Sequence, residues 1–415
     1  MHIEHISLKD FRNYGRLDLD VGPSVNIVYG NNAQGKTNLI EAINICSSVT
    51  GHRTSRDRDL IRFGSDGYEI RMTCFDEEYK SETELFAGFY VSDNGISSSG
   101  SVRRVLKHDG MKIDRISDYI GICNTVIFAP EDLNLIKGAP SGRRKFFNLM
   151  ISKISPSYYD ILSRTNRLIN QKNASLKELK GDVYSINDTV FDFWDFSLSD
   201  LSAEMILMRY RFALLLAEKA KAHHGRISSG KEDLEITYNT VTGVNELLGR
   251  FFDEETKLHA FMDGSLSEAN LSVLRHDLSE HLLAKFRQTR KTDVMKGIST
   301  TGIHRDDLEI KLGGLPMRLY SSQGQQRSAA LSLKLSELDM IRDITGSSPV
   351  LLLDDVFSEL DATRRKSLLE SIRDAQIFVT CTDKDDAGMN ISPDLMDTDK
   401  DIRFFHVESG SIISG

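Results

Sequence analysis

The sequence lacks several features that would assign it to a specialised class of protein. It has four cysteines among its 415 residues, Cys46, Cys74, Cys123 and Cys381, and no two of them form a CxxC pair. This spacing argues against a zinc knuckle or a redox motif, and we expect reduced thiols in a reducing compartment. Seven prolines and 29 glycines exclude collagen-like and low-complexity classes.

Long apolar runs and an excess of positive charge are also missing. No stretch approaches the ~18 apolar residues that a membrane span needs. The first residues, MHIEHISLKDF, carry charges and lack the apolar core of a signal peptide, so we expect a cytoplasmic protein with no membrane partner. Lysine and arginine total 52 against 61 aspartates and glutamates, a formal charge of −9. A nucleic-acid partner would therefore have to be met by a local basic patch.

The hydropathy pattern changes twice along the chain. The pattern over residues 1–140 predicts strands, a loop of the phosphate-binding type and an antiparallel sheet over 68–113. Residues 141–291 have almost no strand signals and read as a helical insertion. Residues 292–415 return to α/β. We expect an α/β fold with mixed and antiparallel sheets, whose N-terminal and C-terminal lobes form one head around the insertion.

One loop follows a short apolar strand and precedes a helical pattern. Its residues fit the pattern GxxxxGK[ST] and are Gly30, Asn31, Asn32, Ala33, Gln34, Gly35, Lys36 and Thr37. In such a P-loop the glycines let backbone N–H groups point at phosphate oxygens, and the helix start adds its dipole. We expect Lys36 to reach the β- and γ-phosphates of ATP and Thr37 to bind Mg²⁺.

A P-loop also needs an acidic residue on a neighbouring strand. Residues 350–353 are four apolar residues, and Asp354 and Asp355 follow them. We expect Asp354 to join the Mg²⁺ shell and Asp355 to lie near the attacking water. Alone, the segment could equally be a buried strand with an acidic turn, and the P-loop favours the catalytic interpretation. Lys36, Asp354 and Asp355 are thus the candidate catalytic residues.

A third motif opens a helix about 30 residues before Asp354. The stretch Ser321-Ser322-Gln323-Gly324-Gln325-Gln326-Arg327 resembles the ABC-type signature, in which a Ser-Gly-Gly-Gln-like segment covers the γ-phosphate held by a second subunit. Ser322, Gly324 and Gln325 match that pattern, and Gln323 replaces its first glycine. The alternative is a simple helix cap. Asp361, in Ser-Glu-Leu-Asp, follows at the spacing of a D-loop.

The split head resembles the SMC/Rad50 class, and in detail it resembles the RecF family of bacterial recombination-repair ATPases. The stretches that carry this resemblance are Leu-Lys-Asp-Phe-Arg-Asn-Tyr at 8–14, Gly-His-Arg-Thr at 51–54, Phe-Ala-Pro-Glu-Asp-Leu at 128–133, Gly-Ala-Pro at 138–140 with Arg143-Arg144, His-Arg-Asp-Asp at 304–307, and the three motifs above. Ile303 departs from the proline usual in that family.

The resemblance implies an ATP-dependent homodimer, in which ATP on one P-loop meets Ser322 to Gln325 of the other copy. It further implies binding to double-stranded DNA at gaps or single-strand/double-strand junctions, and work with RecR and RecO to load RecA. In related heads Arg12 and Asn13 approach the nucleotide, whereas a solvated turn is the alternative. ABC-type enzymes usually have Glu where Asp355 stands. Asp is one methylene shorter, and a catalytic carboxylate set back by about 1 Å can lower the reaction rate about 10²-fold. We therefore expect slow, DNA-stimulated ATP hydrolysis.

Three further assignments stay open at this stage. Clusters of basic residues could contact DNA phosphates or simply face solvent; they include Arg53, Arg56, Arg58 and Arg62, then Arg103, Arg104 and Lys107, then Arg143, Arg144 and Lys145. Glu131, in the segment 130–137, could stand in for a Q-loop residue near the metal. His304 is favoured as a structural residue over a general base.

Two competing functions share the same motifs. The nucleotide-binding subunit of a membrane transporter would have the P-loop, the signature and the acidic pair, but the large insertion and Asp355 argue against it. A scaffold that binds ATP without hydrolysing it is the other alternative. No histidine or cysteine clusters occur at metal-ligand spacing, so Mg²⁺, bound together with ATP, is the only metal expected.

Overall fold

The computed structural model describes residues 1–51, 56–92, 101–372, 375–383 and 401–414. The chain forms two compact units. Unit 1 comprises residues 1–133, 226–230 and 327–415, and unit 2 comprises residues 134–225 and 231–326. Unit 1 therefore joins the two ends of the chain, as a split head requires. Unit 2 takes in residues 134–140 and 292–326 as well as the helical segment, whereas the sequence pattern grouped those residues with the lobes.

A six-stranded sheet forms the core of unit 1. Its order is β15 (Ser411–Ser414), β14 (Ile402–Glu408), β3 (Val25–Tyr29), β13 (Ile377–Cys381), β12 (Val350–Asp354) and β8 (Thr125–Phe128). All neighbours are parallel except the β14–β15 pair. Every residue of β12 is buried, which explains its unbroken apolar run. The parallel arrangement brings the carboxyl ends of β3, β13 and β12 to one edge.

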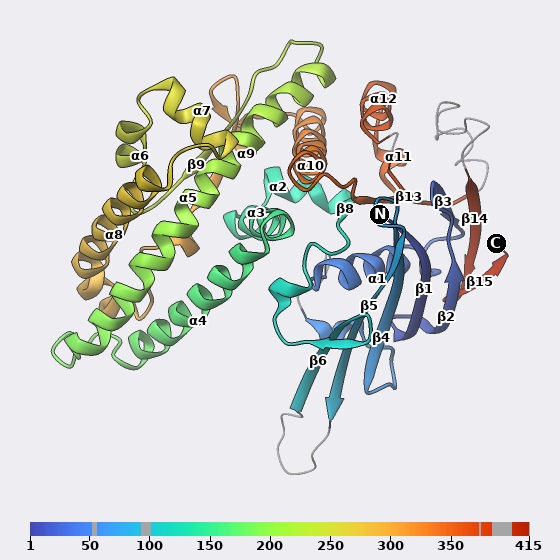
Figure 1. Cartoon of the computed structure of the whole chain (residues 1–415), viewed down its shortest axis with the longest axis horizontal. Coiled ribbons are helices and arrows are strands. Elements are labelled where there is room, and N and C mark those ends of the chain that lie inside the picture. The colour runs from blue at the N-terminus through green and yellow to red at the C-terminus, as the bar shows by residue number, and fades with distance from the viewer. Residues whose placement is uncertain (52–55, 93–100, 373–374, 384–400, 415) are drawn as a thin grey trace. The chain divides into compact units, whose positions relative to one another are not determined.

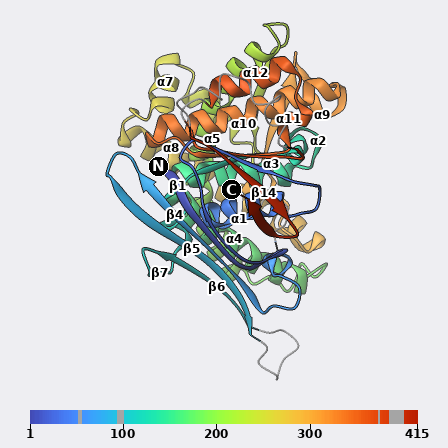
Figure 2. The same ribbon diagram turned by 90° about the vertical axis from the view of Figure 1, so that its right-hand side faces the viewer.

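The second sheet of unit 1 is antiparallel and confirms the prediction for residues 68–113. Its order is β2 (Tyr14–Asp20), β1 (His2–Phe11), β4 (Gly67–Asp76), β5 (Ser81–Ser92), β6 (Ser101–His108) and β7 (Met111–Ile113). Figure 2 shows β1, β4, β5 and β6 side by side along one face of this unit. Helix α1 (Lys36–Ser48) contacts strands of both sheets, and most of its side chains are buried.

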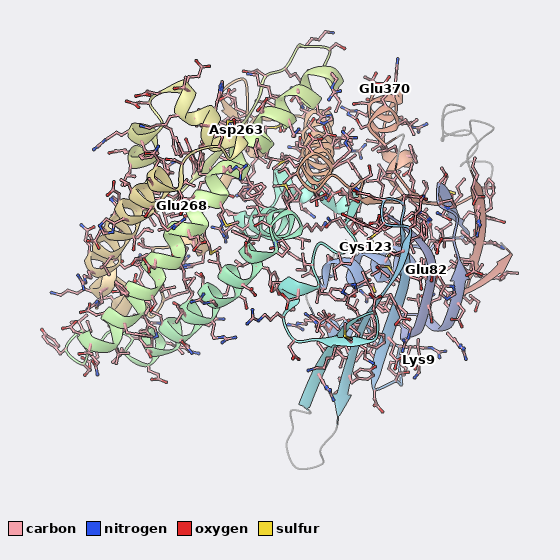
Figure 3. The ribbon with its side chains drawn as sticks, in the orientation of Figure 1. Lys9, Glu82, Cys123, Asp263, Glu268 and Glu370 are labelled. Carbon is pink, nitrogen blue, oxygen red and sulfur yellow. The ribbon has the colours of Figure 1, made fainter. Side chains whose placement is uncertain are left out.

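Unit 1 contains further helical elements besides α1. They are the short 3₁₀ turns η1 (Asp57–Leu60), η2 (Ile116–Asp118) and η3 (Pro130–Leu133), and the helices α11 (Val356–Glu359) and α12 (Ala362–Ser371). Helix α10 (Gln323–Thr345) begins in unit 2 and continues into unit 1. Cys46, Cys74 and Cys123 are buried in unit 1, where Figure 3 labels Cys123, and Cys381 is partly exposed.

Unit 2 is mainly helical, as the sequence predicts. Its helices are α2 (Asn134–Lys137), α3 (Pro140–Ile154), α4 (Pro156–Glu178), α5 (Asp188–Ile227), α6 (Asn245–Phe251), α7 (Glu255–Asp263), α8 (Glu268–Lys296) and α9 (Met317–Tyr320), with the 3₁₀ turn η4 (Ile303–Arg305). Helices α5 and α8 lie side by side (Figure 1), and Arg290 of α8 pairs with Asp192 and Asp195 of α5 at 2.6 and 2.8 Å. None of the helices in the described part of the chain is long and apolar enough to cross a membrane.

Unit 2 also contains a strand that the sequence analysis missed. Strand β9 (Leu234–Asn239) pairs antiparallel with β10 (Asp307–Leu312), and β11 (Leu315–Pro316) completes a three-stranded sheet. Leu234, Ile236 and Tyr238 are buried, and Glu235 and Thr237 between them are exposed. This strict alternation is the ordinary signal of a half-buried strand. The surrounding helical periodicity concealed it.

Candidate functional site

The loop 30–37 has a backbone that its glycines make possible. Gly30 and Gly35 have φ values of 147° and 124°, which side chains rarely allow. A Cβ on Gly30 would lie 2.4 Å from the carbonyl oxygen of Val407, and one on Gly35 would lie 2.7 Å from Nδ2 of Asn13. Helix α1 begins at Lys36, directly after the loop. The predicted order of strand, glycine-containing loop and helix is therefore confirmed.

Neighbouring segments hold this loop in place from two sides. Nδ2 of Asn13 donates to the carbonyl of Gln34 at 2.7 Å, and the Tyr14 hydroxyl donates to the carbonyl of Gly35 at 3.0 Å. From the C-terminal hairpin, the backbone N–H of Ser409 donates to Oε1 of Gln34 at 2.7 Å. The N–H of Gly410 donates to the Gln34 carbonyl at 2.9 Å. The loop is thus rigidly supported by residues far apart in sequence.

The acidic pair meets the loop at the edge of the parallel sheet. The Thr37 hydroxyl donates to Oδ1 of Asp354 at 2.9 Å, and the Thr380 hydroxyl donates to the same oxygen at 2.8 Å. Thr380 lies in β13, between the strands that carry the two motifs. Its hydroxyl also accepts from the backbone N–H of Asp355 at 2.9 Å. Sequence reasoning missed Thr380, because its role depends on the place of β13 between β3 and β12 in the sheet.

Lys36 lies folded over its own loop. Its Nζ donates to the carbonyl of Asn31 at 2.9 Å and also to the carbonyl of Gly30. Burial lowers the pKa of this ammonium group, and the nearby Asp355, Cys381 and Asp354 oppose that effect. A phosphate oxygen could replace either carbonyl as acceptor, so the geometry suits the predicted contact with phosphate.

Asp355 has an unusual backbone conformation. Its φ is 52°, in the left-handed region, and Asp355 is exposed directly before α11. Asp and Asn adopt this region more readily than longer side chains because a short polar group can bond locally. The conformation thus supplies a backbone reason for Asp at this position.

The oxygen donors at this edge fit a magnesium ion. A threonine hydroxyl and one carboxylate are hard oxygen ligands, and Mg²⁺ commonly takes only one or two protein groups beside phosphates and water. Among the described residues, no group of three or more histidines, cysteines, aspartates or glutamates could hold a metal by itself.

The signature segment lies in unit 2 and forms a reciprocal helix cap. The backbone N–H of Gln325 donates to Oγ of Ser322 at 3.3 Å, and the backbone N–H of Ser322 donates to Oε1 of Gln325 at 2.8 Å. This is a capping box in which Gln takes the third helical position. Ser322 is exposed, and Gly324 and Gln325 are half-buried. The cap interpretation is therefore correct for the single chain, and it leaves a role toward nucleotide as a prediction.

Two other predicted nucleotide-binding residues have clear partners within unit 1. Arg12 donates through Nη1 to the carbonyl of Asp59 at 2.7 Å, and its Nη2 lies 2.9 Å from the Glu41 carboxylate. Asp361 caps α12 by accepting from the N–H of Arg364 at 3.0 Å. Neither Arg12 nor Asn13 is a solvated turn residue. Their contact with a nucleotide, like that of Asp361, stays a prediction.

The stretch 304–307 and the arginine pair before it form one packed group in unit 2. Arg143 is buried and makes two bonds to the Asp307 carboxylate, at 2.8 and 2.7 Å. Arg144 donates to the Asp306 carbonyl at 2.7 Å. Both arginines are therefore structural in this unit, which removes Arg143 as a candidate DNA contact. Burial lowers the pKa of His304 to about 4, and its Nε2 contacts the Ser299 carbonyl at 3.3 Å.

Two of the basic clusters meet on unit 1. Asp57 of η1 forms an ion pair with Arg104 of β6 and accepts from the Tyr68 hydroxyl at 3.2 Å. Arg56, Arg58 and Arg103 are exposed around this pair. Arg53 lies outside the described residues. Glu131 follows β8, the strand next to β12, so it lies at the sheet edge that carries Asp354.

Comparison with known proteins agrees with these features. The family model described as "RecF/RecN/SMC N terminal domain" matches residues 2–391. The "DNA replication and repair protein RecF" of Clostridium acetobutylicum is 34% identical over 415 residues, covering 99% of each chain. That of Halalkalibacterium halodurans is 37% identical over 418 residues with the same coverage. The solved "recombination mediator protein RecF-ATP in RecFOR pathway" has 30% identity and a TM-score of 0.79, covering 100% of this chain and 99% of the other.

Proposed function

The chain belongs to the RecF family, and we propose that it is a DNA recombination and repair protein that dimerises when it binds ATP. Its fold is an ABC-type P-loop ATPase head with an added helical unit. The curated relatives are named as DNA replication and repair proteins, and a solved relative is a RecF-ATP structure in the RecFOR pathway. The family resemblance excludes the transporter alternative.

The observation that carries the proposal is the hydrogen bond between Thr37 and Asp354. It joins the helix after the P-loop to the end of strand β12 at 2.9 Å, and this supports a Mg²⁺–nucleotide site in unit 1 to which both motifs would contribute. Thr37 and Asp354 would hold the ion, which would neutralise charge on the β- and γ-phosphates. The backbone of residues 30–35 and Lys36 would bind the phosphate oxygens.

Hydrolysis would depend on Asp355, which stands next to the metal ligand. Its carboxylate is the group available to orient water, and its side chain is one methylene shorter than the Glu usual in ABC-type enzymes. Because general-base geometry is strict, we expect slow turnover that DNA stimulates. Slow hydrolysis suits a switch in which ATP keeps two copies together.

The signature would act on the nucleotide of a second copy. Ser322 is exposed at the start of α10, and it can donate its hydroxyl hydrogen to a phosphate oxygen while its oxygen caps the helix. The segment that precedes Ser322 has three exposed apolar side chains, Leu315, Leu319 and Tyr320. Such an apolar group beside a polar motif is typical of a protein interface. A second copy of this chain would cover it.

Double-stranded DNA would contact the basic surface of unit 1 that contains Arg56, Arg58, Arg103 and Arg104. Arginines recognise phosphates mainly through charge and N–H donors, so this surface would bind gaps and junctions by backbone and shape rather than by base reading. RecR and RecO, with loading of RecA, are the partners that the family suggests, in a cytoplasmic setting. Each of these assignments is part of the proposal.

Sedimentation velocity with and without ATP, repeated with a gapped duplex, tests the proposal. We expect a monomer without nucleotide, a dimer with Mg-ATP, and a dimer–DNA complex with the duplex. A single copy that binds Mg-ATP tightly and never associates would overturn it. Comparing hydrolysis by the wild type and Lys36→Arg identifies the scaffold alternative, which predicts no turnover by either protein.

A further inference from the structure

One carboxylate in unit 2 contacts the signature and has no part in the function proposed so far. Glu232 lies between the end of α5 and the start of β9. Its Oε1 accepts from Nε2 of Gln325 at 3.0 Å, and its Oε2 lies 2.9 Å from Nε2 of His224. The His224 side chain is completely buried, and that of Glu232 is 25% exposed.

The contact with Glu232 determines which way the Gln325 amide faces. An amide has a donating nitrogen and an accepting oxygen, and a carboxylate can only accept. With Nε2 directed to Glu232, Oε1 is left for the backbone N–H of Ser322, which donates to it at 2.8 Å. The reverse orientation would put NH₂ against an N–H donor and an oxygen against a carboxylate. Glu232 therefore selects the amide orientation that completes the capping box.

His224 in turn orients Glu232. His224 lies in the last turn of α5, and its imidazole is held in place because it is buried. The contact with this fixed ring restricts the rotamers of the Glu232 carboxylate. Two contacts therefore connect three side chains in succession: His224 near the end of α5, Glu232, and Gln325 in the signature. Positioning groups of this kind, which hold a contact residue by hydrogen bonds, are a general requirement for precise sites.

We propose that Glu232 is a positioning residue that holds Gln325, and through it Ser322, in the arrangement that receives the γ-phosphate of a second copy. This inference rests on the proposed ATP-dependent dimer. Glu232 itself contacts no nucleotide in this scheme. Its effect is confined to unit 2, so ATP binding by the P-loop of a single chain does not depend on it.

Paired substitutions separate hydrogen bonding from charge and from general stability. Glu232→Ala removes both contacts. Glu232→Gln keeps an oxygen that can accept from Gln325 and removes the charge, and its nitrogen can donate to His224 when the neutral ring carries its proton on Nδ1. Asp233→Ala is the matched control, because the neighbouring Asp233 side chain pairs with Lys221 at 2.8 Å and belongs to the same segment.

The readouts are ATP affinity of the single chain at high dilution and the dissociation constant of the dimer in saturating Mg-ATP. Because a dimer would contain the contact twice, we expect Glu232→Ala to weaken dimerisation by about 10- to 100-fold with ATP affinity unchanged. Glu232→Gln should restore dimerisation to within about threefold, and Asp233→Ala should resemble the wild type.

Equal dimerisation by Glu232→Ala and the wild type would overturn the inference while leaving the proposed function intact. Failure of Glu232→Gln to rescue would also overturn it, because charge would then be the cause. Loss of ATP affinity together with dimerisation in Glu232→Ala would indicate general damage and count against it. If the wild type itself does not dimerise with ATP, the proposed function fails first.

Discussion

The hydroxyl of Thr37 donates to Oδ1 of Asp354 across 317 residues of sequence. This bond and the one from Thr380 to the same oxygen fix the direction of the Asp354 carboxylate. A metal that binds here meets a preorganised acceptor, so little side-chain entropy remains to be lost.

Lys36→Ala should weaken ATP binding by about 10- to 100-fold. The substitution removes a buried ammonium that would otherwise exchange backbone carbonyls for phosphate oxygens, and charged hydrogen bonds contribute about 1.5–3 kcal/mol. Isothermal titration with Mg-ATP measures the change. Lys9→Ala serves as the control, since Lys9 is 62% exposed and lies 3.6 Å from Glu69. Equal affinities for Lys36→Ala and the wild type would contradict the site.

Asp355→Glu should raise single-turnover hydrolysis in the presence of DNA by about 10- to 100-fold, because the longer side chain extends the carboxylate toward water. Asp adopts the left-handed φ of 52° several-fold more readily than most other residues, so a lower melting temperature should accompany the gain. Asp355→Asn should abolish hydrolysis without that penalty. Wild-type turnover of tens per second would refute the slow-switch interpretation.

Tyr320→Ser should weaken ATP-dependent dimerisation by about tenfold, because this exposed side chain would be buried by the second copy. Sedimentation equilibrium in Mg-ATP provides the dissociation constant. Tyr184→Ser is the control, since Tyr184 is 97% exposed and Tyr320 is 67% exposed. A parallel loss in both variants, or in neither, would show that the region of α9 (Met317–Tyr320) is not part of the interface.

Arg56→Ala combined with Arg58→Ala should weaken duplex binding and flatten its salt dependence. Each phosphate contact contributes about 0.9 to the slope of log affinity against log salt concentration, so two lost contacts should reduce the slope by about 2. Fluorescence anisotropy at about 50 to 200 mM salt measures both. Arg250→Ala is a suitable control because Arg250 is 82% exposed in unit 2. An unchanged slope would exclude this surface.

His304 should make unfolding sensitive to mild acid. Its pKa is about 4 in the folded chain and about 6.5 when unfolded, since burial disfavours the charged ring. As pH falls between these values only the unfolded chain gains the proton, so stability falls by up to about 3 kcal/mol. Urea unfolding from pH 7 to pH 4 should show this loss in the wild type and a smaller one in His304→Asn. ATP hydrolysis above pH 7 should not depend on titration of His304.

Much of the parallel sheet and the nucleotide site was predictable because the evidence is local. A P-loop needs a strand, glycines and a helix start in one short stretch, and the run before Asp354 marks a buried strand in the same way. The capping box at Ser322 was also recognisable from residue types alone. Order along the chain then indicated which motifs belong together.

The residues that the sequence did not reveal depend on contacts between distant segments. Thr380 matters because β13 inserts between β3 and β12, an order that no spacing encodes. Arg143 looked like part of a basic cluster, yet its partner Asp307 is 164 residues away. Glu232 is unremarkable in sequence, because its partner Gln325 is 93 residues away.

The attachment of the phosphate loop to Ser409 and Gly410 has a consequence for the order of folding. Strand β14 lies beside β3, and the turn after it supports Gln34 from 375 residues away in sequence. A folding intermediate in which β14 has not yet joined the sheet lacks that support, even if the segment around Gln34 has already formed. Competence to bind nucleotide should therefore appear only once β14 has paired with β3.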